Sequence, residues 1–185
     1  DKKIDERTDL LSGYVQLQKE KEFSDRYLRD ITLNFMLAGR DTTSVCSSFS
    51  CYLLAAHPEK QKKVIEEIDA IVGENIPTYD LLKKLEYTTA VINESLRLYP
   101  PVPFDPKWTL EDDVLPSGYK IKKNTQVTWC AWGMGRLDLY WDKPEEFRPE
   151  RWMGENGGIP IRTYQFTPFQ AGPRTCLGKQ MAYQE

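Results

Sequence analysis

Apolar residues recur at helical spacing through the first half of the chain. The predicted helices cover residues 4–22, 24–56, 58–72, 78–85 and 88–98. The second of them carries apolar residues on several faces, which is typical of a helix surrounded by protein. Pro58 suits a first helical turn, Thr78 is a candidate cap, and Gly73 and Pro100 each mark the end of a helix.

The pattern changes after the last of these helices. Residues 118–122 and 125–131 look like two strands around a Lys123-Asn124 turn. The stretch 141–152 is rich in proline, aromatic and charged residues, which indicates an irregular packed meander, and 155–158 is typical of a surface turn. Helices followed by a small sheet predict a fold that is mainly α with a small β part.

Composition indicates a soluble globular protein. Of the 185 residues, 40% are hydrophobic and 29% charged. The net charge of −3 and the scattered basic residues give no indication of a nucleic-acid partner. The cysteines are Cys46, Cys51, Cys130 and Cys176. They form no Cys-x-x-Cys pair, and His57 is the one histidine, so the pattern favours neither a zinc site nor a disulfide scaffold.

The sequence shows no targeting or membrane segment. It opens on a charged run instead of a signal peptide. Residues 42–58 are uncharged but contain Thr, Ser and Cys throughout, whereas a membrane span needs about 20 predominantly apolar residues. We therefore expect a buried helix there. The charged start, and an end shortly after Cys176, lead us to expect a partial chain.

Residues 169–178 form the most informative stretch, a glycine-flanked loop that an aromatic residue opens. Arg174 and a following helix start both favour the thiolate form of Cys176. Gly172 and Gly178 allow backbone angles that would let the chain pass close under a porphyrin. A thiolate bound to haem iron favours cleavage of an O–O bond. The alternative is a buried free cysteine in a turn.

Residues 38–43 place a glycine and two threonines inside the long predicted helix, where they are poor helix formers. One interpretation is a tolerated weak spot, with Thr hydroxyls bonded to carbonyls one turn earlier. The other is a local opening of the helix that makes room for dioxygen. Asp41 and Thr42 would then be an acid and an alcohol that carry protons.

Two segments pair Glu with Arg at a spacing of three residues. Most such pairs are solvated and contribute about 0.3–0.5 kcal/mol. Glu94 and Arg97 differ from Glu145 and Arg148 because they lie in an apolar helix that ends in Pro-Pro. The segment Phe-Arg-Pro-Glu-Arg-Trp, which contains Arg151, follows later in the chain.

These motifs together resemble a cytochrome P-450, a haem-thiolate monooxygenase. They are Ala-Gly-x-Asp-Thr-Thr, Glu-x-x-Arg, Pro-Glu-Arg-Trp and Phe-x-x-Gly-x-Arg-x-Cys-x-Gly, in the family's order. The resemblance implies the C-terminal portion of that fold, with its long central helix, Glu-x-x-Arg helix, meander and cysteine loop. Residues 1–185 would be a partial single domain that lacks the N-terminal portion and the extreme C-terminus.

The resemblance also implies a haem b group with Cys176 as its axial iron ligand. The residues expected to contact haem are Ala38, Gly39, Phe169, Gly172, Arg174, Cys176 and Gly178. Arg174 would bind a propionate, Phe169 would pack near the sulfur, and the N–H groups of Leu177 and Gly178 would stabilise the thiolate. Lys107 and Arg136 are weaker candidates, for a propionate or for surface contacts. Residues 101–105 would line the distal pocket or form an ordinary loop.

By the same resemblance, Asp41 and Thr42 are the catalytic acid–alcohol pair, with Thr42 bonded to the dioxygen above the iron. Glu94, Arg97 and Arg151 would form a buried triad that determines the fold on the haem side. The family usually has Phe where Trp152 stands, a departure that leaves Arg151 in place.

The implied reaction inserts one oxygen atom from O2 into a C–H bond of a hydrophobic substrate. Electrons would come from NADPH through a flavoprotein reductase, at the cytosolic face of the endoplasmic reticulum, where an anchor absent from this chain would hold the parent protein. Residues 113–119, 134–136 and 169–179 look like the plant fatty-acid ω-hydroxylase group. A haem-thiolate hydroperoxide isomerase or dehydratase and a truncated, non-catalytic product remain the alternatives.

Overall fold

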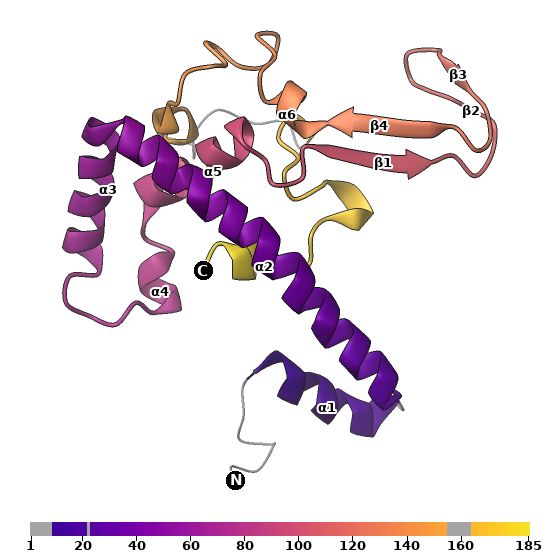
Figure 1. The fold of residues 1–185 in the computed structure, drawn as a ribbon, viewed down its shortest axis with the longest axis horizontal. Coiled ribbons are helices and arrows are strands. Elements are labelled where there is room, and N and C mark those ends of the chain that lie inside the picture. Colours follow the sequence, from indigo (N-terminus) through magenta and orange to yellow (C-terminus); the bar gives the residue numbers. More distant parts are fainter. Residues whose placement is uncertain (1–8, 22, 155–163) are drawn as a thin grey trace. The chain divides into compact units, whose positions relative to one another are not determined.

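A computed structural model describes residues 9–21, 23–154 and 164–185. The chain divides into two compact units, Asp1–Thr43 and Ser44–Glu185 (Figure 1). Its elements are mostly helices, with two small sheets in the second unit, so the predicted mainly α fold with a small β part is confirmed. The surface turn expected at 155–158 lies outside the described residues.

The first unit contains α1 (Leu10–Lys21) and the beginning of α2 (Asp25–Ala56). Asp9 caps α1, because its carboxylate accepts hydrogen bonds from the Ser12 backbone N–H at 2.9 Å and the Ser12 hydroxyl at 2.8 Å. The Ser24 hydroxyl accepts a hydrogen bond from a backbone N–H in the first turn of α2. Both predicted helices are confirmed, although residues 4–8 and 22 lie outside the described part.

The burial expected along α2 is wrong for most of its length. Leu28 and Leu53 are buried, but Met36, Val45 and Phe49 are exposed. The described residues supply apolar neighbours to only part of the helix surface. Within residues 9–21, 23–154 and 164–185, no helix has the length and apolar character that a bilayer crossing requires.

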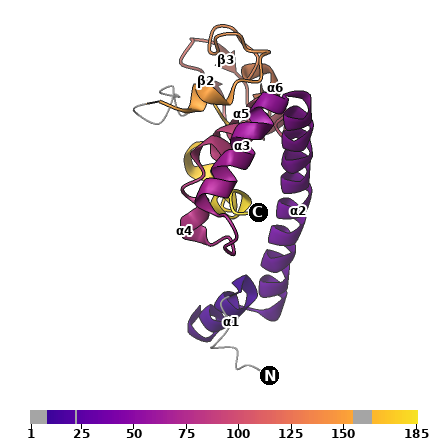
Figure 2. The same cartoon turned by 90° about the vertical axis from the view of Figure 1, so that its left-hand side faces the viewer.

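The core of the second unit lies where the end of α2 meets α3 (Pro58–Ile71) and α5 (Glu86–Leu98), which lie near each other in Figures 1 and 2. Its buried residues are Leu53, Val64, Tyr87, Val91, Leu98 and Phe147. They come from three helices and from the segment after α6, so this core joins the meander to the helices. The predicted end of α3 near Gly73 is confirmed.

The short helix α4 (Tyr79–Leu82) starts where expected, but the Thr78 hydroxyl makes no capping hydrogen bond. α5 begins two residues earlier than predicted because a side chain from α3 caps it. The Glu67 carboxylate accepts hydrogen bonds from the backbone N–H groups of Tyr87 at 2.6 Å and Thr88 at 2.8 Å. A tertiary contact therefore sets this boundary, which local sequence signals do not contain.

The strands are β1 (Phe104–Trp108), β2 (Asp113–Val114), β3 (Lys120–Ile121) and β4 (Gln126–Cys130). Strands within both predicted ranges form, but they do not pair with each other around the Lys123-Asn124 turn. β4 pairs with β1 and β3 pairs with β2, each antiparallel (Figure 1). The sequence did not predict β1, because Pro106 argues against a strand. Proline is tolerated at the edge of a sheet, where β1 lies.

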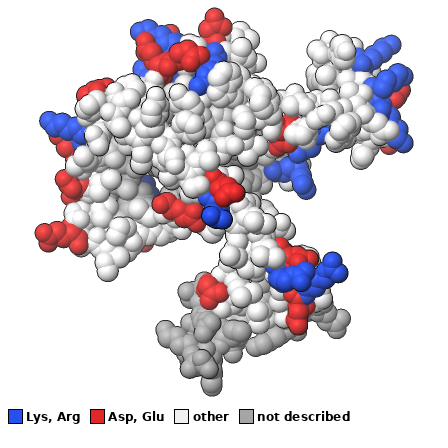
Figure 3. All heavy atoms as spheres, viewed as in Figure 1, with Lys and Arg blue, Asp and Glu red and all other residues white. Residues whose placement is uncertain are grey.

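Residues 135–154 and 164–178 are largely irregular, as predicted for the meander and the cysteine loop. They follow α6 (Ala131–Met134) and include two 3-10 helices, η2 (Pro149–Trp152) and η3 (Gly172–Arg174). The last element is α7 (Lys179–Ala182). Figure 3 shows side chains of both charges interspersed on the face drawn, as the scattered charges of the sequence predict.

Candidate functional site

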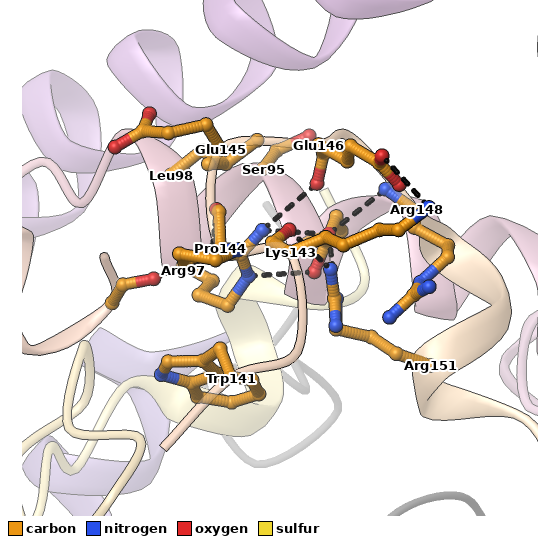
Figure 4. A network of polar contacts seen from close by, with 12 residues as sticks. Ser95, Arg97, Leu98, Trp141, Lys143, Pro144, Glu145, Glu146, Arg148 and Arg151 are labelled. Carbon is orange, nitrogen blue, oxygen red and sulfur yellow. Dashed lines mark hydrogen bonds and ion pairs between the residues drawn. The ribbon is translucent and has the colours of Figure 1, made fainter. Parts of the chain in front are cut away.

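Two charged residues of one helix meet a third from a distant part of the sequence in the interior of the second unit. Glu94 and Arg97 lie three residues apart on the buried face of α5, and Arg151 lies on η2. Their exposed fractions are 0%, 1% and 4%. Figure 4 shows the side chains of Arg97 and Arg151 converging, with Trp141 beside Arg97. The structure therefore brings the predicted triad together.

Five hydrogen bonds saturate the Glu94 carboxylate. Oε1 accepts from Arg97 Nη2 at 2.8 Å, from Arg151 Nε at 2.9 Å and from the Arg148 backbone N–H at 2.9 Å. Oε2 accepts from Arg97 Nε at 2.9 Å and from the indole Nε1 of Trp152 at 2.8 Å. Burial alone would raise the pKa of Glu94, but the hydrogen bonds and positive charges of these arginines outweigh it and lower that pKa.

All five N–H groups of the Arg97 guanidinium also have acceptors. Nε and Nη2 bind Glu94, and the remaining N–H groups donate to the carbonyls of Gly135, Pro144 and Glu146. A Cβ at Gly135 would collide with the Arg97 carbonyl, so this close approach requires glycine. A buried ion pair offsets its desolvation only when its remaining donors and acceptors are satisfied, as they are here.

Arg151 ties the start of the meander to the same cluster. Its Nη1 donates to the Asp142 carbonyl at 3.0 Å and its Nη2 to the Lys143 carbonyl at 3.3 Å. Lys143 has a φ of +47°, a conformation that costs about 1 kcal/mol or more for a non-glycine residue. The turn that presents these carbonyls to Arg151 is therefore a strained one.

The second Glu-x-x-Arg pair behaves as an ordinary surface pair. Glu145 contacts Arg136 Nε at 3.4 Å, and Arg148 binds Asp142 at 2.8 Å, so Glu145 and Arg148 use separate partners. The Glu145 side chain is 72% exposed. Burial, and not spacing, separates this pair from Glu94 and Arg97.

Glu150, next to Arg151 on η2, fastens that helix to α3 and α5. Its carboxylate contacts Lys60 at 3.3 Å and Lys63 at 2.7 Å and accepts a hydrogen bond from the Tyr87 hydroxyl at 3.0 Å. Partial burial would raise the pKa of Glu150, but the hydrogen bonds from Lys63, from its own backbone and from Tyr87 outweigh this effect. Together with the charge of Lys60 they lower that pKa to about 2.

This contact predicts an acid-dependent loss of stability. Because the pKa of Glu150 is lower in the folded chain, its contribution is complete above about pH 4.5 and is lost as the pH falls through about 2. Glu150 is 38% exposed, and solvent screening limits the effect to about 1 kcal/mol. Unfolding free energies of the chain and of Glu150→Gln should differ at neutral pH and converge in acid, while Glu145→Gln serves as the exposed control. A difference that does not change with pH would contradict this assignment.

The Cys176 loop is closed by its own backbone. The Cys176 N–H donates to the Phe169 carbonyl at 2.9 Å, and the Thr175 N–H donates to the Gly172 carbonyl at 3.1 Å. Gly172 has a φ of +71°, so it uses the freedom expected of it. Gly178, with a φ of −84°, does not. Gln170 has a φ of +66° and occupies the left-handed region without being a glycine, which the sequence did not indicate.

The residues around Cys176 suit a thiolate ligand beneath a flat group. The side chains of Cys176 and Arg174 are exposed, so the alternative of a buried free cysteine is wrong. Among the described residues, no backbone carbonyl accepts a hydrogen bond from the N–H of Leu177 or Gly178. A Cβ built on Gly172 would meet no atom within 4 Å, so the loop is open there.

The segment 38–43 shows no break in the helix. α2 is helical throughout, and the Thr42 hydroxyl donates to the Ala38 carbonyl at 2.6 Å. The hydroxyl-to-carbonyl bond therefore forms, and the local opening of the helix is absent from residues 38–43. Asp41 is exposed and lies 3.9 Å from Arg40, in an ion pair that solvent screens. Gly39 and these residues belong to the first unit, whereas Cys176 belongs to the second.

Arg136 and Lys107, the weaker candidates for a haem propionate, both contact other residues of the chain. The Arg136 guanidinium lies 4.1 Å from the centre of the Trp132 ring and donates to the Leu98 carbonyl, and its side chain is 11% exposed. Arg136 is therefore neither a surface residue nor a free cation. Lys107 contacts Asp105 at 3.0 Å. Residues 101–103 form the loop after α5, and 104–105 are the first two residues of β1.

A cavity of about 440 Å³ opens in the second unit beside the end of α2. Its walls include Tyr52, His57, Tyr99 and Phe147. Of the residues that the sequence singled out, Arg136 and Glu145 line it, but Cys176 and the buried triad do not. The candidate chemistry therefore does not lie in this cavity.

Several plant proteins are similar to this chain in sequence. Cytochrome P-450 86B1 of Arabidopsis thaliana is 42% identical over 96% of this chain and 34% of its own length. For cytochrome P-450 94C1 of the same plant the identity is 40%, over 97% of this chain and 37% of the relative. The alkane hydroxylase MAH1 of Arabidopsis thaliana is 40% identical over 92% of this chain and 33% of its own length. The chain thus spans about a third of the length of these relatives. The family model for cytochrome P-450 matches residues 1–185, and the chain belongs to the cytochrome P-450 family.

Proposed function

We propose that this chain is part of a haem-thiolate monooxygenase, within a single cytochrome P-450 domain, and that Cys176 is the axial ligand. The observation that carries the proposal is the exposed Cys176 thiol on a loop closed by its own backbone. The N–H groups of Leu177 and Gly178 are placed in sequence to donate to the sulfur and stabilise its charge. The same chain contains the other motifs of the family in order.

The residues that would hold haem have distinct tasks. Cys176 supplies the thiolate, the exposed Arg174 guanidinium binds a propionate, and Gly172 keeps a side chain out of the loop. The Phe169 ring packs against Tyr183 with 5.3 Å between ring centres, which fixes it near the loop. When bound, haem supplies the activation of O2 that allows one oxygen atom to enter a C–H bond. The electrons would come from NADPH through a flavoprotein reductase.

Asp41 and Thr42 are proposed to carry protons to the reaction. The Thr42 hydroxyl donates its hydrogen to Ala38, so it must release that bond before it donates elsewhere. Asp41 is exposed, so water reaches its carboxylate. The presence of both residues also argues against a hydroperoxide isomerase or dehydratase, in which this pair is often lost.

Thr42→Ala is expected to lower the product formed per NADPH oxidised about tenfold or more, because the hydroxyl that positions the proton is lost. Reductant would still be consumed, and released peroxide would increase. The Ala variant keeps the helix, since alanine is the best helix former. Thr43→Ala is the matched control, one position along α2. Unchanged coupling between NADPH and product would remove Thr42 from the proton path.

We further propose a fatty-acid substrate that is oxidised at its ω end. The support is the resemblance of residues 113–119, 134–136 and 169–179 to the plant ω-hydroxylase group, together with a relative named alkane hydroxylase. The parent protein would act at the cytosolic face of the endoplasmic reticulum. Turnover of fatty acids and of alkanes with equal chain length tests the substrate. Oxidation of the alkanes alone would contradict the fatty-acid assignment.

A further inference from the structure

Both ends of the Cys176 loop are fastened to neighbouring residues of α5. Before the loop, the Phe166 ring packs on the Trp152 ring with 4.6 Å between centres, and the Trp152 indole N–H donates to Glu94 Oε2 at 2.8 Å. After the loop, the hydroxyl of Tyr183, which follows α7, donates to Asn93 Oδ1. Asn93 and Glu94 are consecutive in a helix whose inner face is buried.

The attachment before the loop is rigid because its acceptor cannot move. Glu94 is fully buried and held by two arginines, so Trp152 donates to a fixed oxygen. The Trp152 ring also contacts Trp141, with 5.7 Å between ring centres. Three residues after Phe166 comes Phe169, whose carbonyl accepts the Cys176 N–H. Trp152 is thereby connected to the Cys176 backbone, through the Phe166 ring, the chain from Phe166 to Phe169 and the hydrogen bond of Phe169.

The attachment after the loop is made by Tyr183, which contacts both Asn93 and Phe169. Burial raises the pKa of Tyr183, so its hydroxyl stays protonated and remains a donor to Asn93. Its ring packs on Phe169 with 5.3 Å between centres and an angle of 39° between the planes. Phe169 therefore contacts Tyr183 after the loop and is joined to Phe166 before it through three residues of backbone.

From this geometry we infer that Trp152 and Tyr183 are positioning residues that hold the Cys176 loop on Glu94 and Asn93 of α5. The purpose of that positioning rests on the proposed function, in which Cys176 binds iron. The attachment itself needs no haem.

The two residues offer matched variants, because Trp152→Phe and Tyr183→Phe each keep a ring and remove one donor. Hydrogen exchange of the Cys176 amide, measured without haem, reports opening of the loop. Each variant is expected to speed this exchange about tenfold, since a hydrogen bond to a fixed partner is lost. Exchange in residues 62–70 of α3 should stay unchanged. Trp108→Phe and Tyr119→Phe, at positions 63% and 69% exposed, are the controls.

The result separates positioning from a general effect on folding. Faster exchange of the Cys176 amide with unchanged α3 amides supports the inference. Equal acceleration in α3 and in the loop would show that the variants only weaken the whole unit, and would overturn it. So would unchanged loop exchange in both variants, or an unprotected Cys176 amide in the unaltered chain. None of these outcomes bears on whether Cys176 binds haem.

Discussion

Glu94→Gln is expected to lower the free energy of unfolding by about 3–5 kcal/mol, a large part of the stability of a typical domain. The amide has the shape of the carboxylate but carries no charge, and it turns one acceptor oxygen into a donor. Arg97 and Arg151 would then remain buried without a counter-charge. One of their N–H groups, or that of Trp152, would face the new amide nitrogen.

Urea unfolding followed by circular dichroism measures this loss. Glu145→Gln is the matched control, because Glu145 pairs with an arginine at 3.4 Å but its side chain is 72% exposed. The control should change the free energy of unfolding by less than about 0.5 kcal/mol. Equal losses of unfolding free energy in Glu94→Gln and Glu145→Gln would contradict the stabilising role assigned to the buried Glu94 cluster.

Cys176→Ser is expected to differ from Glu94→Gln, because it should leave the free energy of unfolding almost unchanged and abolish oxygen insertion. The Cys176 side chain is exposed, so the haem-free variant should unfold within about 0.5 kcal/mol of the unaltered chain. A serine hydroxyl does not ionise near neutral pH and is a much harder ligand than a thiolate. Oxygen insertion should fall below detection.

The controls for this variant lie in the other cysteines. Cys51→Ser changes another exposed cysteine, on α2, and should leave haem ligation intact. Substrate turnover and haem absorption measured side by side separate loss of the ligand from loss of the fold. Residual oxygen insertion by Cys176→Ser would remove the thiolate from the mechanism.

Local patterns in the sequence were sufficient for the long helices α2 and α3, because a period of 3.6 residues and terminal Pro or Gly signals are local. The bounds of α2 and α3 follow from them. The pairing of β1 with β4 joins residues about twenty positions apart and was not predicted, since hydrophobic period alone does not specify strand partners. The start of α5 depends on Glu67 from another helix.

The triad was predicted from motifs and not from physics. Spacing alone cannot separate Glu94 and Arg97 from Glu145 and Arg148, because burial decides the outcome and depends on the whole fold. The sequence alone presents Trp152 as a small departure from the family's Phe, but its indole N–H is one of the donors to Glu94. The sequence does indicate this hydrogen bond, because Trp152 has an N–H donor that Phe lacks and follows Arg151 directly. The contact of Tyr183 with Asn93 had no local signal.

The reduced, CO-bound absorption spectrum of the haem-loaded protein tests the central claim most directly. Thiolate ligation by Cys176 predicts the thiolate-type Soret band in the unaltered protein and in Cys51→Ser, and its loss in Cys176→Ser. The same band in Cys176→Ser, or its absence from the unaltered protein, would contradict the assignment of Cys176 as the iron ligand.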